Sequence, residues 1–141
     1  MRIPPALLML LASSALAQSP YVIPQPVEFS LRAGSCNLTC GWAFQGSSTE
    51  LTGLLGAETS EMQQRRPIDC ELVIELALIT PDTLLPREWH TLTIESERIR
   101  LIASSEEGLF RGSRTLVQLL EQGSETGSLP CLTITDWPRF P

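Results

Sequence analysis

The sequence contains no lysine and a single histidine, and only 6% of its 141 residues are aromatic. All ten basic residues are arginines, and they face sixteen acidic residues, which leaves a formal net charge of -6. A nucleic-acid-binding protein normally presents a basic patch to phosphates, so this balance argues against that class. The acidic residues form no run of five or more, which excludes an acidic interaction tail. We expect a soluble acidic domain with no nucleic-acid partner.

Sequence motifs for common enzyme chemistries are also missing. There is no glycine-rich phosphate loop, no HExxH and no GxSxG. A histidine-dependent triad would have to use His90, which lies in a strand-like stretch where a packed or surface histidine is the expected alternative. A chain of 141 residues makes one domain and is too short for a (β/α)8 barrel, which needs at least about 200 residues.

The N-terminal residues are typical of an export signal. The positive charge of Arg2 precedes an apolar run over residues 6–11, and residues 15–17 (ALA) fit the small-x-small pattern of signal peptidase cleavage. The apolar run is far shorter than the ~20 residues that cross a membrane, so we expect no membrane span. The alternative is an N-terminal helix packed in the core. We predict a signal peptide over residues 1–17, a mature chain from Gln18, and a periplasmic or secreted protein.

Four cysteines follow the export signal, and an oxidising compartment permits disulfides. Cys36, Cys40, Cys70 and Cys131 allow three pairings, which the sequence leaves open. If residues 36–40 are extended they span about 13 Å, so a bridge between Cys36 and Cys40 would require a turn. A zinc site is the functional alternative, but no CxxC pair exists. We expect structural or free thiols, and neither a metal nor a cofactor.

The first half of the chain carries weak secondary-structure signals. Residues 21–29 mix strand-forming residues with two prolines, which indicates an edge strand or an extended segment leading into the sheet. Residues 33–35 (AGS) mark a turn into a short strand over residues 36–39. Ser47 forms a capping box with the glutamate three positions on, which predicts a short helix that ends at Gly56.

Stronger strand signals come next. Residues 70–79 are rich in strand formers, and their alternation places an apolar face from Leu72 to Leu78. A helix is the rival prediction there, because the two glutamates of this stretch are four residues apart. Residues 89–94 and 99–103 give the clearest strand signal, a hairpin that turns over residues 95–98.

A longer helix and a last strand complete the predicted elements. A second capping box, at Ser104, opens a helix to about Gln122, and Gly112 in its interior indicates close packing on a sheet. A loop over residues 123–128 leads to a strand over residues 131–135. The pattern predicts an α+β fold, with a small mainly antiparallel sheet and two helices packed on one face. Helical spacing places five residues on one face of the longer helix, which is expected to meet the sheet: Leu109, Ser113, Leu116, Val117 and Leu120.

Paired carboxylates remain as a catalytic option, because two acids about 5 to 9 Å apart can hydrolyse sugars. The candidates by adjacency are Glu71 with Glu75, Glu95 with Glu97, and Glu106 with Glu107. The first two pairs suit the solvated side of a strand, and the third suits the first turn of a helix. A sugar-stacking platform would need tryptophans close together, whereas these lie in separate segments, so core or interdomain packing is expected of Trp42, Trp89 and Trp137. We predict no catalytic residue.

Three stretches carry a family resemblance: residues 22–26 (VIPQP), residues 89–120 and residues 132–140 (LTITDWPRF). The middle stretch is the most specific, and it is similar to the pattern Y-x-L-x-I … I-x-I-x-A … G-L-F-x-G-x-x-T-L-x-Q-L. The last stretch is similar to I-x-D-x-P-R-F. Both patterns belong to the non-catalytic N-terminal domain of family 20 β-N-acetylhexosaminidases, also called chitobiases, which this chain therefore resembles. Residues 36–70 match poorly.

The resemblance implies a domain over residues 18–136 and, over residues 137–141, the start of a junction to a (β/α)8 barrel. Trp137, Arg139 and Phe140 would make the junction contacts, and an apolar face there and on the last helix would meet the barrel. In the family an adjacent Asp-Glu pair on the barrel removes terminal N-acetylhexosamine residues, and this chain contains no Asp-Glu dipeptide. We expect an N-terminal fragment that is inactive alone, with a barrel in cis or from a neighbouring reading frame as its partner.

Two other function classes remain open at this point. An export signal without an enzyme constellation also suits a freestanding secreted module that binds glycans or a partner protein. Four cysteines suit, in addition, a disulfide-stapled structural or inhibitor protein.

Overall fold

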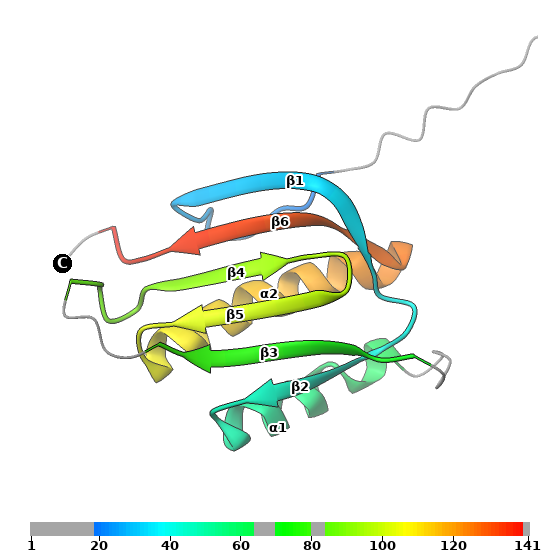
Figure 1. Ribbon diagram of the computed structural model, residues 1–141, viewed down its shortest axis with the longest axis horizontal. Coiled ribbons are helices and arrows are strands. Elements are labelled where there is room, and N and C mark those ends of the chain that lie inside the picture. The colour runs from blue at the N-terminus through cyan, green and yellow to red at the C-terminus, as the bar shows by residue number, and fades with distance from the viewer. Residues whose placement is uncertain (1–18, 64–69, 80–83, 140–141) are drawn as a thin grey trace, which may run out of the picture.

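The computed structural model describes residues 19–63, 70–79 and 84–139 (Figure 1). The predicted signal peptide over residues 1–17 lies outside these residues. The strands are β1 (Glu28–Asn37), β2 (Trp42–Gly46), β3 (Leu72–Leu78), β4 (His90–Ile94), β5 (Arg98–Ala103) and β6 (Ser128–Asp136). The helices are α1 (Thr49–Glu58), the short 3-10 helix η1 (Ser60–Gln63) and α2 (Glu106–Thr126).

The strands form one sheet in the order β1-β6-β4-β5-β3-β2. β1, β6, β4 and β5 pair antiparallel in that order, whereas β3 runs parallel to β5 and to β2. β2 and β3 are parallel because α1 carries the chain back along the sheet between them. In Figure 1, α2 passes behind the sheet and α1 lies at its β2 end. The predicted α+β fold, with a mainly antiparallel sheet and two helices, is confirmed.

The α2 helix packs its apolar stripe against β3, β4, β5 and β6. Burial confirms the five positions predicted to face the sheet: Leu109, Ser113, Leu116, Val117 and Leu120. Gly112 lies at the closest approach, since a Cβ there would come within 2.5 Å of Leu101 Cδ1 and 2.9 Å of His90 Cδ2. The close packing predicted at Gly112 is therefore confirmed.

Both α-helices begin one residue later than predicted. Ser48 caps α1 and Ser105 caps α2, and each side chain accepts a hydrogen bond from the backbone amide three residues ahead. The predicted caps, Ser47 and Ser104, directly precede them in two Ser-Ser pairs. Only the first serine of each pair has a glutamate three positions on, yet the second serine makes the cap. The side chain of Ser104 is engaged elsewhere, donating to the carbonyl of Pro86 at 2.7 Å.

The predicted helix ends were too early. α1 runs through Gly56 to Glu58, because Gly56 does not adopt the left-handed conformation with which a glycine ends a helix. The loop predicted over residues 123–128 is wrong, since α2 continues to Thr126. Gly127, with a φ of 85°, ends the helix in the left-handed conformation that glycine adopts without strain.

The turn predicted at residues 33–35 is a bulge inside one long strand. The β1–β6 register shifts between Leu31 and Ser35, and Gly34 there has a φ of 101°. The strand predicted over residues 36–39 is therefore the end of β1. For residues 21–29 the sequence left open an edge strand or an extended segment that leads into the sheet. Both are correct in part, because residues 21–27 lie outside the sheet and lead into β1, which is an edge strand.

The β3 prediction and the hairpin prediction are confirmed. Residues 72–78 form a strand with alternating burial, so the rival helix is wrong. The β4–β5 turn is closed by the amide of Glu95, which donates to the carbonyl of Arg98 at 2.8 Å. The sequence did not predict β2, because residues 42–46 (WAFQG) show too short a pattern for periodicity to reveal.

Cys40 and Cys70 form a disulfide, with Cα atoms 5.0 Å apart. Trp42 of β2 pairs with Leu72 of the parallel β3, so the residues two positions before each lie side by side. Cys36 and Cys131 are free and buried. Burial raises the pKa of the Cys36 thiol from 9.0 to about 11, with a further contribution from Cys131, and this keeps the thiol protonated.

Candidate functional site

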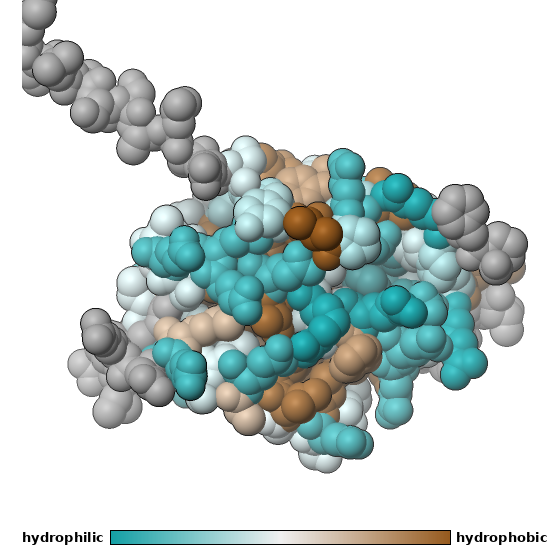
Figure 2. Space-filling model, turned by 180° about the vertical axis from the view of Figure 1, so that it is seen from behind, coloured by the Kyte–Doolittle hydropathy of each residue, from teal (hydrophilic) through white to brown (hydrophobic). Residues whose placement is uncertain are grey.

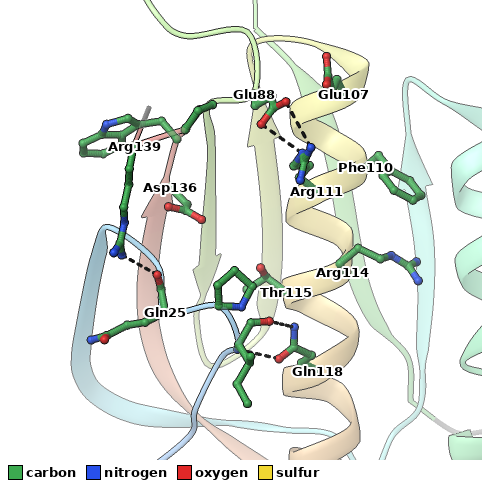
Figure 3. A pocket seen from close by; sticks show the side chains of 14 residues that line it. Gln25, Glu88, Glu107, Phe110, Arg111, Arg114, Thr115, Gln118, Asp136 and Arg139 are labelled. Carbon is green, nitrogen blue, oxygen red and sulfur yellow. Dashed lines mark hydrogen bonds and ion pairs between the residues drawn. The ribbon is translucent and has the colours of Figure 1, made fainter. Parts of the chain in front are cut away.

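A groove of about 720 Å³ runs along the outer side of α2, and we call it the α2 groove (Figure 3). We call residues 19–27, which precede β1, the N-terminal arm; its residues Ile23, Pro24 and Gln25 form one wall of the groove. Residues 136–139, after β6, close one end. Figure 2 shows this side of the molecule, where apolar surface is exposed between charged side chains. Two large apolar residues contribute to the groove: Ile23 is 70% exposed and Phe110 is 49% exposed.

Two glutamines of α2 hold the N-terminal arm. Gln118 accepts from the amide of Ile23 and donates to its carbonyl, both at 2.9 Å, and Gln122 binds Tyr21 in the same way at 3.0 and 2.6 Å. Helix residues four apart are separated by ~6 Å, which matches the ~6.6 Å between alternate residues of an extended chain. The two side-chain amides therefore pair with the arm as a neighbouring strand would. This contact was not predicted, although the four-residue spacing of Gln118 and Gln122 and the two-residue spacing of Tyr21 and Ile23 can be read from the sequence.

Changing Gln118 to glutamate is expected to release the N-terminal arm. A carboxylate still accepts from the amide of Ile23, but it cannot donate to the carbonyl and instead opposes that oxygen. We expect protease cleavage within residues 19–27 to become about tenfold faster while the far-UV circular dichroism stays unchanged. Gln118→Met, which removes both hydrogen bonds without adding charge, should also accelerate cleavage. Limited proteolysis with mass spectrometry tests this, and unchanged rates in both variants would contradict it.

The residues after β6 clamp the other end of the N-terminal arm. Arg139 donates to the carbonyl of Gln25 at 2.7 Å, as Figure 3 shows, and more weakly to that of Pro26 at 3.3 Å. Asp136 accepts a hydrogen bond from the amide of Val27 at 3.0 Å. The residues that lead into β1 are thus tied to those that follow β6.

The junction residues named from the sequence meet at this groove as far as the structure describes them. Trp137 is half-buried and lines the groove, and Arg139 makes the clamp described above. Phe140 lies outside the described residues. The three stretches that carried the family resemblance meet at this groove. They supply most of the N-terminal arm, Gln118 of α2, and residues 136–139.

Each acidic side chain that lines the groove already has a partner. Glu88 pairs with Arg111 at 3.2 Å, and Glu107 pairs with Arg87 at 3.1 Å. Asp136 accepts from the arm. A general acid and base need a free carboxyl pair facing a substrate, and these acids are committed to holding segments of the fold.

The three adjacent glutamate pairs suggested by the sequence do not converge in a cleft among the described residues. Glu75 is held by Arg98 at 2.6 Å and by Arg100 at 3.3 Å, across β3 and β5. The pair at residues 95 and 97 is exposed in the β4–β5 turn, and the pair at 106–107 begins α2. That the chain has no catalytic residue stays a prediction.

The single histidine and the tryptophans are packing residues where the structure describes them. His90 is 3% exposed, and its Nδ1 lies 3.1 Å from the carbonyl oxygen of Glu88. Trp42 is 5% exposed, and its Nε1 donates to the hydroxyl of Thr59 at 3.0 Å. Trp89 is half-buried at the start of β4. These tryptophans are not assembled into a sugar-stacking platform.

Two glutamates predict an acid-dependent loss of stability. Two hydrogen bonds from Arg114 hold the pKa of Glu58 below 4.5, and hydrogen bonds from Arg98 and Arg100 do the same for Glu75. Because the folded pKa is the lower one, this stabilisation is complete above about pH 4.5 and is lost as the pH falls through the lowered pKa.

The Glu58→Gln/Glu75→Gln double variant should therefore have a lower Tm than the wild type at neutral pH. Its Tm should also decline less steeply below about pH 4.5, because the two groups no longer titrate. Thermal unfolding followed by circular dichroism over a pH series measures both effects. Glu121→Gln/Glu125→Gln changes the net charge equally and is the matched control, since neither residue forms an ion pair in the described part of the chain. Parallel pH profiles for the wild type and the first variant would contradict the prediction.

Neither a metal-binding cluster nor a membrane-spanning helix is found among the residues that the structure describes. Within residues 19–63, 70–79 and 84–139, no group of three or more histidine, cysteine or acidic residues could hold a metal ion. Over the same ranges, no helix is both long and apolar enough to span a lipid bilayer.

Comparison with known proteins assigns the family. The family model described as glycosyl hydrolase family 20, domain 2, matches residues 19–137. A β-hexosaminidase of Vibrio furnissii is 30% identical over 122 residues, which cover 84% of this chain and 20% of the relative. A solved β-N-acetylhexosaminidase from Bacteroides fragilis superimposes with a TM-score of 0.61 at 22% identity, covering 86% of this chain and 25% of that one. A family 20 β-N-acetylglucosaminidase gives 0.64 at 24% identity, with 86% and 23% covered.

These similarities cover most of this chain but only a small part of each relative. The chain spans about a fifth of the curated relative and about a quarter of the two solved structures. The solved structures show the same fold, and the family match extends over the N-terminal arm and over Asp136, which accepts from the amide of Val27 in that arm. The chain therefore belongs to glycosyl hydrolase family 20, and the domain it contains is the non-catalytic domain 2 of that family.

Proposed function

We propose that this domain supports a β-N-acetylhexosaminidase by packing the α2 groove against a catalytic (β/α)8 barrel. The observation that carries the proposal is exposed apolar surface beside residues 137–139, which resemble the junction to such a barrel. Ile23 and Phe110 are large, apolar and open to solvent there, and Trp137 is half-buried next to them. An exposed apolar patch on a small domain is typical of a surface that a partner covers. The barrel is supplied in cis or from a neighbouring reading frame.

The barrel, rather than this domain, would remove terminal N-acetylhexosamine residues from glycans. The sequence contains no Asp-Glu dipeptide, the pair that the family uses for catalysis. The acids of the α2 groove are engaged in ion pairs or hydrogen bonds. On this proposal the purified chain releases no nitrophenol from a nitrophenyl N-acetylglucosaminide.

A domain exchange tests the packing directly. The matching part of the Vibrio furnissii β-hexosaminidase is replaced by this chain, and activity on the nitrophenyl substrate is measured. We expect an active chimera and at least tenfold lower activity in the Phe110→Asp chimera, because a carboxylate would be buried against the barrel. Leu54→Asp is the matched control, since Leu54 is 51% exposed and lies on α1 outside the groove. Equal loss in both variants, or nitrophenol release by the chain alone, would overturn the proposal.

Export to the periplasm or the medium forms a second part of the proposal. The N-terminal pattern of a signal peptide supports it, and so does the Cys40–Cys70 disulfide, which persists in an oxidising compartment. Expression of the full chain in a bacterial host, followed by fractionation and N-terminal sequencing, is expected to yield a periplasmic protein that begins at Gln18. A cytoplasmic protein that retains residues 1–17 would refute it.

A further inference from the structure

The outer edge of β1 is unpaired in the part of the chain that the structure describes. β1 lies at the end of the strand order and bonds only to β6, so its other edge is open, as the top of the sheet in Figure 1 shows. All five residues from Glu28 to Arg32 are exposed. Proteins commonly protect such an edge with lysine, proline or a covering loop, because open strands pair with other chains. Residues 28–32 (EFSLR) contain neither lysine nor proline.

This stretch is complementary to itself when two copies run antiparallel about Ser30. Glu28 of one copy then lies opposite Arg32 of the other, and the arrangement repeats on the far side of the two-fold axis. Phe29 lies opposite Leu31, again twice. Opposite charges and apolar pairs directly across an antiparallel ladder are the combinations that stabilise it. An isologous contact of this kind closes into a dimer.

The side chains concerned are available for such a contact. Neither Glu28 nor Arg32 takes part in an ion pair within the described residues, although five ion pairs occupy other glutamates and arginines. Phe29 is 37% exposed and Leu31 is 52% exposed. Their register partners on β6 are the buried core residues Ile134 and Leu132, so both side chains extend the core face toward the open edge.

We propose that the partner of this edge is a second copy of the same chain, joined β1 to β1 in antiparallel register centred on Ser30. The two sheets then form one continuous sheet, in which each copy adds the same strand to the other. Only about five residues of each copy pair, so the contact is smaller than a standard interface and the dimer is a weak, reversible one. The α2 groove is lined by none of the β1 residues and stays open in this dimer.

A charge exchange tests the register. Glu28→Arg places two like-charged pairs across the axis, and so does Arg32→Glu, so each variant alone is expected to dimerise at least about tenfold more weakly than the wild type. A mixture of the two variants restores both ion pairs and should form a heterodimer with wild-type affinity. Glu97→Arg, an equal charge change in the β4–β5 turn, is the control. Sedimentation velocity over a concentration series measures all four, with circular dichroism to verify folding.

A second variant tests the edge without relying on charge pairing. Leu31→Lys places a solvated charge where the two apolar pairs would form, and should abolish the dimer. Leu54→Lys makes the same change at a residue of equal exposure, 51% against 52%, and should leave the dimer intact. A wild-type chain that is monomeric at every concentration would overturn the proposal. Failure of the mixed charge variants to associate would overturn the register.

Discussion

Serine at both Cys40 and Cys70 is expected to lower the free energy of unfolding by about 3–4 kcal/mol. The disulfide joins residues 30 positions apart, and without it the unfolded chain regains the entropy of an open loop. The loop contains β2 and α1, which form the end of the sheet opposite β1. Loosening should therefore start at that end. Urea unfolding of the oxidised wild type and of the variant measures the difference.

Reduction of the wild type provides the control for this prediction. A phosphine reductant should lower the stability of the wild type to that of the Cys40→Ser/Cys70→Ser variant, and should leave the variant unchanged. Thiol titration of the unfolded oxidised wild type should count two free thiols, which belong to Cys36 and Cys131. Unchanged wild-type stability after reduction would contradict the entropic argument, and a count of four would contradict the disulfide.

Gly108→Ala is expected to destabilise the domain by about 2–3 kcal/mol. A Cβ at this position would lie 2.7 Å from the carbonyl oxygen of Trp89 and 3.2 Å from the carbonyl carbon of Glu88. Both atoms belong to the backbone, which cannot rotate away as a side chain can. The start of α2, capped by Ser105, would have to move off the sheet. Thermal or urea unfolding gives the measured value.

Gly53→Ala supplies the matched comparison. Gly53 lies inside α1 with no atom within 4 Å of the position that a Cβ would take, so alanine there should raise stability by about 0.5–1 kcal/mol. Opposite signs for two identical substitutions in helices would isolate the close approach as the cause. A stabilising or neutral Gly108→Ala would show that α2 sits farther from the strand than the structure has it.

This packing gives a physical reason for the G-L-F-x-G motif. Gly108 and Gly112 are four residues apart, so both lie on the face of α2 that meets the sheet, and at both a Cβ would come closer than 3.0 Å to a neighbouring atom. A helix with a larger residue at either position would need a wider gap from β4 and β5. The motif thus sets the spacing between the helix and the sheet.

Local patterns predicted those elements in which an apolar periodicity extends over enough residues. The β4–β5 hairpin and the inward face of α2 follow from alternation and from helical spacing, which are properties of single segments. The predicted N-cap residues were wrong by one position. Two adjacent serines offer the same hydroxyl, and the path of the backbone selects between them. The turn predicted around Gly34 is a bulge instead, because glycine supports a turn and a bulge equally well.

Contacts between distant segments were beyond the reach of those patterns. The pairing of Cys40 with Cys70 depends on β2 and β3 being parallel neighbours, and β2 itself was not predicted. Gln118 and Arg139 were part of the family resemblance, but their hydrogen bonds to Ile23 and Gln25 depend on the path of the N-terminal arm. Such contacts follow from topology, which no single segment specifies.

The clamp between Arg139 and Gln25 has a mechanical consequence. A pull on the polypeptide at both ends of the domain would load this clamp and the Asp136–Val27 hydrogen bond before it reached the ladders of the sheet. The clamp joins the residues that enter β1 to those that leave β6, whereas Ser19 lies with the C-terminal end of α2, at the other end of β6. A force applied between Ser19 and Arg139 is therefore borne first by the side-chain hydrogen bonds of the N-terminal arm and not by the core.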